Sequence, residues 1–157
     1  MTNKETDIYA AAFFMSDFAA VENGKLYVSG GFWNQFRLAS FPSIVNFSIV
    51  AVLNIPWRAY HQNHKFEVFF EDADGKRLPG ELGGDFTVGT APEMKVGDPT
   101  LMPIAAAING FALQHAGDYS AVLHVDGQEI SRWPFRASQL FVQQNRPISP
   151  SDLPAGL

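Results

Sequence analysis

Apolar and polar residues alternate with a period of two in several separate segments of this chain. The longest regular segment is residues 44–54. The positions that we expect to point inward are Val45, Phe47, Ile49, Ala51 and Leu53, and the outward ones are Asn46, Ser48, Val50 and Val52. Successive side chains of a β-strand point to opposite faces of a sheet, so this pattern predicts a strand, and its apolar content favours a central position.

The same alternation predicts further strands. The alternation recurs in residues 26–28 and 119–125. Residues 8–22 are expected to form the strand that pairs with residues 26–28. Residues 65–72 place Phe66, Val68 and Phe70 inward, with Phe69 on the outward side. Shorter strands are expected at residues 85–90, 101–108 and 129–137. The period of a helix is weak everywhere, and residues 57–63 are the one candidate, for one or two turns.

The last predicted strand contains an irregularity. Its inward and outward positions exchange between Ile130 and Phe135, and Pro134 has no N–H to donate to a neighbouring strand. We therefore expect a bulge or a sheet edge near Arg132-Trp133-Pro134.

Three Asx-Gly dipeptides divide the predicted strands: Asn23-Gly24, Asp74-Gly75 and Asp126-Gly127. A two-residue type I′ turn needs positive φ at both central positions, which Asn, Asp and Gly tolerate. The sequence therefore predicts three hairpins with this turn.

About eight short strands and an interior supplied by 14 Phe residues favour an all-β fold in which two antiparallel sheets form a β-sandwich, immunoglobulin-like or similar. A β-barrel is the alternative. Gly117-Asp118-Tyr119, at the start of a strand, is similar to the corner tyrosine of immunoglobulin-like sandwiches. We expect one domain over residues 1–142, followed by a C-terminal tail over residues 143–157 that is rich in Pro and Ser.

The charge and the absence of cysteine restrict the classes of partner. A formal net charge of -5 repels a phosphate backbone, so we expect no nucleic acid partner. Because the chain has no Cys, it has no disulfide framework, which is typical of a cytoplasmic protein. The apolar run near the N-terminus is too short and too acidic for a signal peptide or a membrane span, so no membrane association is expected.

Two glycines followed by aromatic and amide residues form the most unusual stretch, residues 30–36. Aromatic faces beside amide donors can bind sugars, bases or peptides, and this makes Trp33, Asn34 and Gln35 candidate binding residues, with Trp33 as an exposed anchor. The other interpretation is that the glycines bend a strand out of its sheet while Phe32 or Phe36 closes the end of the sandwich.

Catalytic and metal-binding patterns are weak. His61 and His64 have i, i+3 spacing but no evident third ligand, so we expect no metal. The acidic cluster of Glu71, Asp72, Asp74 and Glu81 lacks the ligand spacing of a calcium loop. No nucleophile elbow, P-loop or dinucleotide fingerprint occurs. The sequence thus predicts a protein that is not an enzyme and needs no cofactor.

Several apolar residues fall on outward positions: Tyr27, Val50, Val52, Phe69 and Val122. An exposed apolar patch marks an interface. We therefore expect a non-catalytic interaction or assembly module that binds a protein partner or forms a homo-oligomer, with Tyr27 and Phe69 among its contact residues. The alternative is a module that binds a carbohydrate or another small ligand through the loop aromatics Trp33 and Trp57.

Six short motifs together resemble an uncharacterised family of small bacterial proteins, known only as a domain of unknown function. The motifs are Asn23-Gly24-Lys25-Leu26, Gly30-Gly31-Phe32-Trp33, Ile55-Pro56-Trp57, Glu71-Asp72-Ala73-Asp74-Gly75, Gly117-Asp118-Tyr119 and Val125-Asp126-Gly127. They span residues 8–137. The resemblance implies an all-β domain and no assigned activity.

Overall fold

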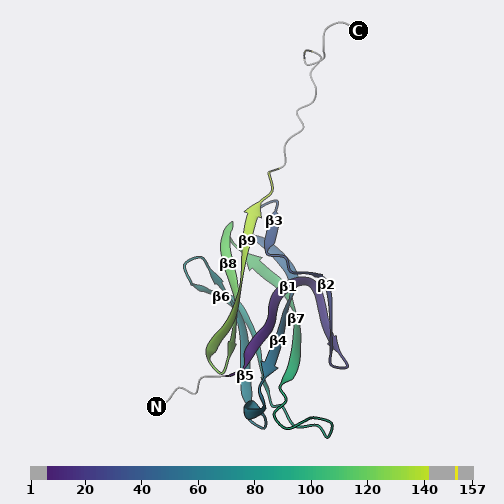
Figure 1. Cartoon of the computed structure of the whole chain (residues 1–157). Helices are drawn as coiled ribbons and strands as arrows, with labels where there is room; N and C mark the ends of the chain where they lie inside the picture. The colour runs from purple at the N-terminus through teal and green to yellow at the C-terminus, as the bar shows by residue number, and fades with distance from the viewer. Residues whose placement is uncertain (1–6, 142–150, 152–157) are drawn as a thin grey trace, which may run out of the picture.

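The structure is a computed structural model that describes residues 7–141 and Ser151. The described part of the chain forms nine strands and one short 3₁₀ helix, η1 (Figure 1). The elements are β1 (Tyr9–Glu22), β2 (Lys25–Gly31), β3 (Gln35–Leu38), β4 (Ser43–Ile55), η1 (Trp57–Ala59), β5 (His64–Asp72), β6 (Arg77–Phe86), β7 (Thr100–Leu113), β8 (Gly117–Val125) and β9 (Gln128–Gln139). The predicted domain boundary at residue 142 and, apart from Ser151, the predicted tail lie outside the described residues.

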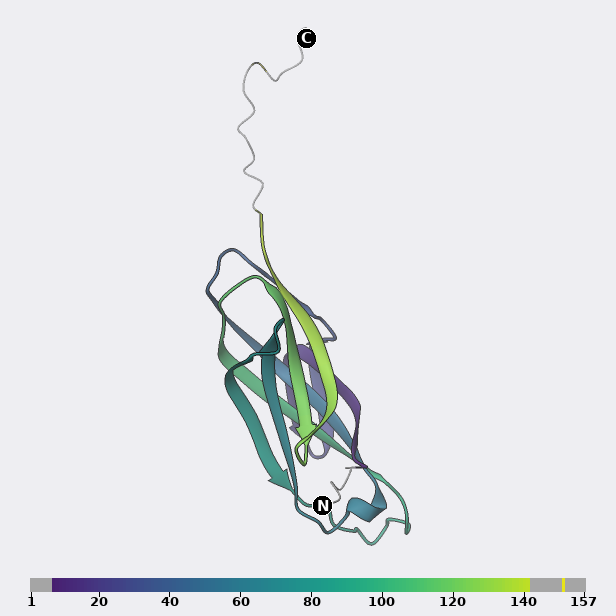
Figure 2. The same ribbon diagram turned by 90° about the vertical axis from the view of Figure 1, so that its left-hand side faces the viewer.

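The strands form two sheets that face each other, as the sandwich prediction requires (Figure 2). Sheet A has the order β2-β1-β4-β7, and sheet B has the order β3-β9-β8-β5-β6. Neighbouring strands are antiparallel except β3 and β9, which are parallel. The long strand predicted over residues 44–54 lies in β4, which has a partner on each side and is therefore central, as expected.

The strand order agrees with an immunoglobulin-like sandwich. In such domains strands B and E are neighbours in one sheet, and strands C, F and G form the other. Here β4 and β7 hold the first pair of positions, and β5, β8 and β9 hold the other three. Tyr119 opens β8, the strand equivalent to F, and its hydroxyl donates a hydrogen bond to the carbonyl of His115 at 2.5 Å. This is the bond expected of a corner tyrosine.

Phenylalanine rings fill the space between the sheets. Phe47 lies on the inner face of β4 and meets Phe36, Phe70 and Phe111 edge-on, each with ring centroids 5.7 Å apart. The inward positions predicted for β4, β5 and β8 all belong to this main core, with Phe66 at its partly buried margin. Edge-to-face aromatic pairs contribute about 0.5–1.5 kcal/mol each beyond their buried area, so the Phe content is what fixes the packing of the two layers.

A second, smaller apolar cluster lies on the outer face of sheet A. β1 curves so that the β1–β2 hairpin approaches β7 and stands out from the body of the sandwich (Figure 1). The buried members of the cluster are Phe14, Ala19 and Val50, and the partly buried ones are Ala12, Leu26, Ala105 and Trp133. Ser48 and Val50 lie on the outward side of β4, as predicted, but both are buried, so the prediction that Val50 belongs to an exposed patch is wrong: the hairpin covers this part of the outer face.

Several strand boundaries differ from the sequence prediction. No strand covers residues 87–90, and the strand expected at residues 85–90 is replaced by β6, which begins at Arg77 and pairs with β5. The four-residue β3 was not predicted, because a short parallel strand is not joined to its partner by a hairpin turn and so no turn motif in the sequence indicates it. The predicted helical segment at 57–63 is reduced to η1.

The irregularity in β9 occurs earlier than expected. The register with β8 shifts at Ile130, between the pairs Leu123–Ser131 and His124–Glu129. Pro134 does lie on a free edge of β9. The N–H of Arg136 donates to the carbonyl of Asn34, so the nitrogen of Pro134, two residues earlier, points to the same side of β9. β3 pairs with β9 only from Arg136 onward, so no strand lies beside Pro134 on that side.

Two of the three predicted type I′ turns are present. Asn23 has φ 49° before Gly24, and Asp126 has φ 51° before Gly127. Around Asp74-Gly75 only the glycine has positive φ, and the loop is wider: the N–H of Gly75 bonds to the carbonyl of Asp72, and the N–H of Asp72 bonds to the carbonyl of Lys76. The type I′ prediction is wrong there, because the Asp72 carboxylate accepts bonds from the N–H groups of Asp74 and Lys76 and stabilises the longer turn.

Candidate functional site

Residues 30–36 carry the chain from sheet A to sheet B, so the interpretation in which a strand leaves its sheet is the one that the fold shows. β2 ends at Gly31 and β3 begins at Gln35 in the other sheet. Gly30 has φ 61°, and a Cβ there would lie 2.3 Å from a carboxylate oxygen of Asp17. A Cβ on Gly31 would lie 2.9 Å from the Val28 side chain. Positive φ at Gly30 and the close contact at Gly31 therefore favour glycine at both positions of the crossing.

The aromatic residues of this crossing have different surroundings. Phe36 points into the main core. Trp33, predicted to be an exposed anchor, is half-buried: its ring packs edge-on against Phe36 and Phe47, and its Nε1 donates to the carbonyl of Gly30 at 2.8 Å. Phe32 is the exposed ring, at 69% of its maximal area, and it stacks on Phe14 with centroids 4.3 Å apart.

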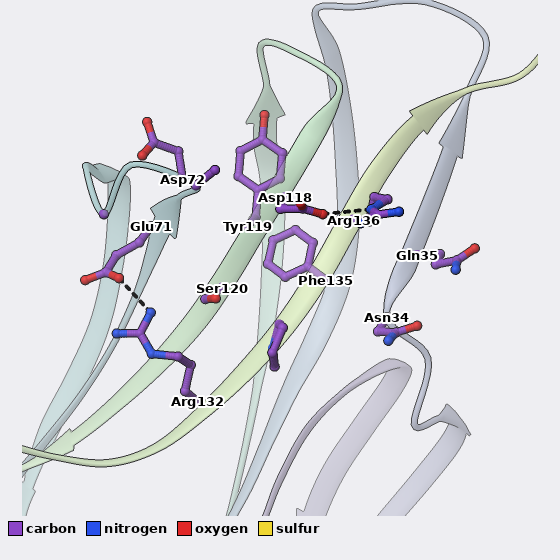
Figure 3. A pocket seen from close by; sticks show the side chains of 13 residues that line it. Asn34, Gln35, Glu71, Asp72, Asp118, Tyr119, Ser120, Arg132, Phe135 and Arg136 are labelled. Atoms are coloured by element: carbon purple, nitrogen blue, oxygen red, sulfur yellow. Dashed lines mark hydrogen bonds and ion pairs between the residues drawn. The ribbon is translucent and has the colours of Figure 1, made fainter.

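Asn34 and Gln35, which follow Trp33, line an open hollow of about 550 Å³ on the outer face of sheet B (Figure 3). Its floor is low because two short residues, Ser120 of β8 and Pro134 of β9, lie directly opposite each other. The remaining lining residues are Glu71, Asp72, Ala73, Gly75, Asp118, Tyr119, Arg132, Phe135 and Arg136.

Ion pairs form the two sides of the hollow. Arg132 Nη1 lies 2.7 Å from Glu71 on one side, and Arg136 Nε lies 2.7 Å from Asp118 on the other (Figure 3). Hydrogen bonds with Glu129 and then with Glu71 raise the pKa of Arg132, and the bond with Asp118 raises the pKa of Arg136. Three carboxylates and two guanidinium groups line the hollow, so its charges nearly cancel. The arrangement suits a neutral, polar ligand better than an ion.

Phe69, predicted to be an exposed contact residue on this face, is only 5% exposed. The guanidinium of Arg77 lies 4.1 Å from its ring centroid, and the ring of His124 packs edge-on against it. Arg77 is held there by ion pairs with Glu67 and Glu81. Val122, directly opposite Phe69, is fully buried. The prediction that these two residues form an exposed patch is wrong: both are buried, and the long side chain of Arg77 covers the ring of Phe69.

Trp57, His61 and His64 lie in or near η1, at the other end of the sandwich. Trp57 is half-buried against Tyr60, with ring centroids 5.1 Å apart. His64 is buried, with Nδ1 2.7 Å from Asp126 Oδ2 and Nε2 2.7 Å from the carbonyl of Ala59. His61 is exposed. His61 and His64 thus differ in their surroundings: His61 is exposed, whereas His64 links η1 to the β8–β9 turn.

The acidic cluster is also occupied by structural contacts. Glu71 pairs with Arg132, Glu81 pairs with Arg77, and Asp72 stabilises its own turn. Within the described residues, no group of three or more His, Asp or Glu side chains could hold a metal ion.

The β1–β2 hairpin presents the largest group of exposed apolar side chains. Tyr27 is 51% exposed, as the outward prediction required, and Phe18 beside it is 58% exposed. They project from one face, since Phe18 lies opposite Ser29, and Ala20 lies opposite Tyr27. Phe18 was not predicted. The Asn23-Gly24 turn fixes this register, so the turn alone could have revealed the pair.

None of the helices among the described residues has the length and apolar character needed to cross a membrane. No curated protein matches the chain in sequence. Among solved structures, the chain is similar to the Pseudomonas fluorescens alkylpurine DNA glycosylase AlkC bound to DNA containing an abasic site analog, with a TM-score of 0.41 and 9% identity. The match covers 83% of this chain and 30% of that protein. A likeness this weak does not bear on function.

One protein-family model matches residues 11–138, a range that contains nearly all of the nine strands. Its description is "Family of unknown function (DUF6941)". This match confirms the resemblance to an uncharacterised family that the turn and corner motifs indicated. This all-β chain belongs to DUF6941, a family of unknown function.

Proposed function

We propose that this protein is a non-catalytic interaction module of the cytoplasm, which binds a protein partner through the β1–β2 hairpin. The observation that carries the proposal is the hairpin's surface: Phe18, Val21, Tyr27 and Val28 are all exposed there, and β2 is the last strand of its sheet. Apolar groups gathered on a projecting element are typical of an interface.

The titratable groups support a non-catalytic role. In the hollow of sheet B the arginines and carboxylates bind one another, and His64 is buried between two structural acceptors. Groups held in this way stabilise the fold and are not poised for proton transfer or nucleophilic attack.

The proposal is tested by placing a photoreactive amino acid at Tyr27 in cells that produce the protein. Irradiation is expected to give discrete covalent adducts with protein, because the partner covers this position. The matched control is the same group at Val96, which is 88% exposed in the β6–β7 loop and is expected to give no discrete adduct. Absence of adducts at Tyr27, or identical adducts at both positions, would contradict the proposal.

The hollow of sheet B supports a second candidate, a small polar ligand such as a carbohydrate. The observation in its favour is that Asn34 and Gln35, both chosen from the sequence, meet Ser120 and two ion pairs around a low floor. Titration with a glycan panel, followed by NMR, is expected to shift the amide signals of Asn34 and Ser120 first. The Asn34→Ala and Gln35→Ala double substitution should weaken binding at least about tenfold, since each lost polar contact costs about 1 kcal/mol. Shifts confined to other parts of the protein would contradict this candidate.

A further inference from the structure

The four edge strands of the sandwich differ in how well they are protected against pairing with another chain. Free edges are usually blunted by proline, charge, bulges or short length. β3 has four residues. β6 carries Pro79, Gly80 with φ 103° and three charged residues. β7 contains Pro103, and the hairpin lies close to it. β2 has a single charge, Lys25, and no proline, and its one glycine with positive φ, Gly30, lies at the end away from the turn, so residues 25–29 are the least protected edge.

The turn at Asn23-Gly24 decides which backbone groups of β2 are free. In a two-residue hairpin the flanking residues, here Glu22 and Lys25, form the hydrogen-bonded pair. Backbone direction alternates along a strand, so Lys25, Tyr27 and Ser29 bond to β1. The N–H and C=O groups of Leu26 and Val28 consequently point away from β1, toward the free edge.

Two copies of β2 related by a two-fold axis can pair only in registers that place one residue opposite itself. With Tyr27 at the axis, Leu26 of each copy lies opposite Val28 of the other, and these are the residues with free backbone groups. Four inter-chain hydrogen bonds then form around a non-hydrogen-bonded Tyr27 pair, where side chains approach most closely.

The side chains favour the same register. It sets apolar residues opposite apolar residues, and it places Lys25 opposite Ser29 of the second copy, so no like charges face each other. With Val28 at the axis instead, Leu26 would face Gly30 and Tyr27 would face Ser29. Backbone direction thus permits each of these registers, and side-chain matching selects the one about Tyr27.

We propose that the partner of the β1–β2 hairpin is a second copy of this chain, joined by antiparallel pairing of the two β2 strands about Tyr27. This inference rests on the proposed function and names its partner. The dimer joins two sheets A into one continuous sheet and brings Phe18 and Tyr27 of both copies onto one face. The paired segment is short, so we expect a reversible dimer with a dissociation constant on the order of micromolar.

Because the chain has no cysteine, single cysteines report the register without background. Tyr27→Cys places two thiols at the axis, within the Cα separation of about 4.4–6.8 Å that a disulfide requires. Mild oxidation is expected to convert most of this variant into a linked dimer. Ser29→Cys is the matched control: it lies on the same face and strand, but each introduced cysteine would lie opposite Lys25 of the other copy, so this variant should form no disulfide-linked dimer.

Analytical ultracentrifugation of the unmodified protein, which has no cysteine, gives a second measurement that does not alter the interface. The average mass is expected to rise toward twice the monomer mass as concentration increases. Tyr27→Lys places two ammonium groups opposite each other and should abolish the rise. Ile44→Lys, at an exposed position on β4, should leave it unchanged.

The outcomes separate this inference from the proposed function. Photoadducts at Tyr27 of twice the monomer mass, together with the Tyr27→Cys disulfide, support both. Adducts of another mass, with a monomeric protein in sedimentation, overturn the second copy but keep the interaction surface. Linkage through Ser29→Cys and not through Tyr27→Cys overturns the proposed pairing.

Discussion

The two sheets treat the apolar residues on their outer faces in different ways. On sheet B, Phe69 is covered by a single side chain: Arg77 lies over its ring, and the carboxylates of Glu67 and Glu81 hold Arg77 in place. On sheet A, Phe14 and Val50 are covered by a whole hairpin, which forms a second small core with them. A side-chain cover has a charged outer surface. A hairpin that covers a sheet adds an outer surface and a free strand edge of its own, and the outer surface of this hairpin carries the apolar residues Phe18 and Tyr27.

This difference explains where we place the interaction. The outer face of sheet B ends in paired charges, which water solvates well and which bind other proteins only at the cost of desolvation. The hairpin on sheet A exposes Phe18 and Tyr27 and leaves the edge of β2 open. Covering one apolar face thereby created another.

The largest effect is expected from the cluster beneath the hairpin. Phe14→Ala removes a buried ring from between sheet A and the hairpin and should lower the free energy of unfolding by about 3–5 kcal/mol. Urea denaturation measures this. Phe18→Ala, on the exposed face of the same strand, should change it by less than about 0.5 kcal/mol. If the two substitutions had equal cost, the hairpin would not be a cover.

The crossing between the sheets should respond next. Gly30→Ala combines positive φ with a contact against Asp17, and we expect a loss of about 1–2 kcal/mol. In an Asp17→Ala background only the backbone strain remains, so the cost should fall. An unchanged cost in the double variant would show that the Asp17 carboxylate moves aside freely.

The cover on sheet B should be weaker. Arg77→Ala is expected to cost about 1 kcal/mol or less, because its ion pairs are partly exposed and screened by solvent. Arg77→Met keeps an apolar stem over Phe69 and should recover most of that loss. Thermal unfolding at low and high salt separates the contribution of the ion pairs from that of packing on Phe69. If Arg77→Met lost as much stability as Arg77→Ala, the effect would belong to the charge.

The smallest effect concerns Phe32, which combines φ 66° with an exposed ring. Phe32→Gly relieves about 1–2 kcal/mol of left-handed strain and gives up a stack on Phe14 worth about 0.5–1.5 kcal/mol. We therefore expect the stability to change by less than about 1 kcal/mol. A larger loss of stability, measured by calorimetry, would show that the Phe32 ring is essential for shielding Phe14 from solvent.

The inner faces of the sandwich were predictable from the sequence. The inward sets of β4, β5 and β8 were correct because period-2 alternation reports directly on a half-buried strand. The Asn23 and Asp126 turns were correct because positive φ at both central positions restricts the residue types. Asp74 failed the same rule, because a side-chain acceptor two residues earlier favoured a longer turn.

The outer faces and the candidate sites were not predictable to the same degree. Tyr27 was correctly placed outside, whereas Phe69 and Val50 were not, since alternation shows only that a side chain points away from the main core. Asn34 and Gln35 reached the hollow of sheet B, but Arg132 and Ser120, 85 or more residues distant, gave no local signal.

The sequence by itself determined most of the strands, two of the three predicted turns and the inward residues of the long strands, because these depend on neighbours close along the chain. Only the tertiary structure decided which outward apolar residues are covered, where the polar hollow forms and which edge remains open. Those features depend on how a hairpin folds back and on which long side chains reach across strands. Such contacts join residues far apart in sequence, and no local pattern records them.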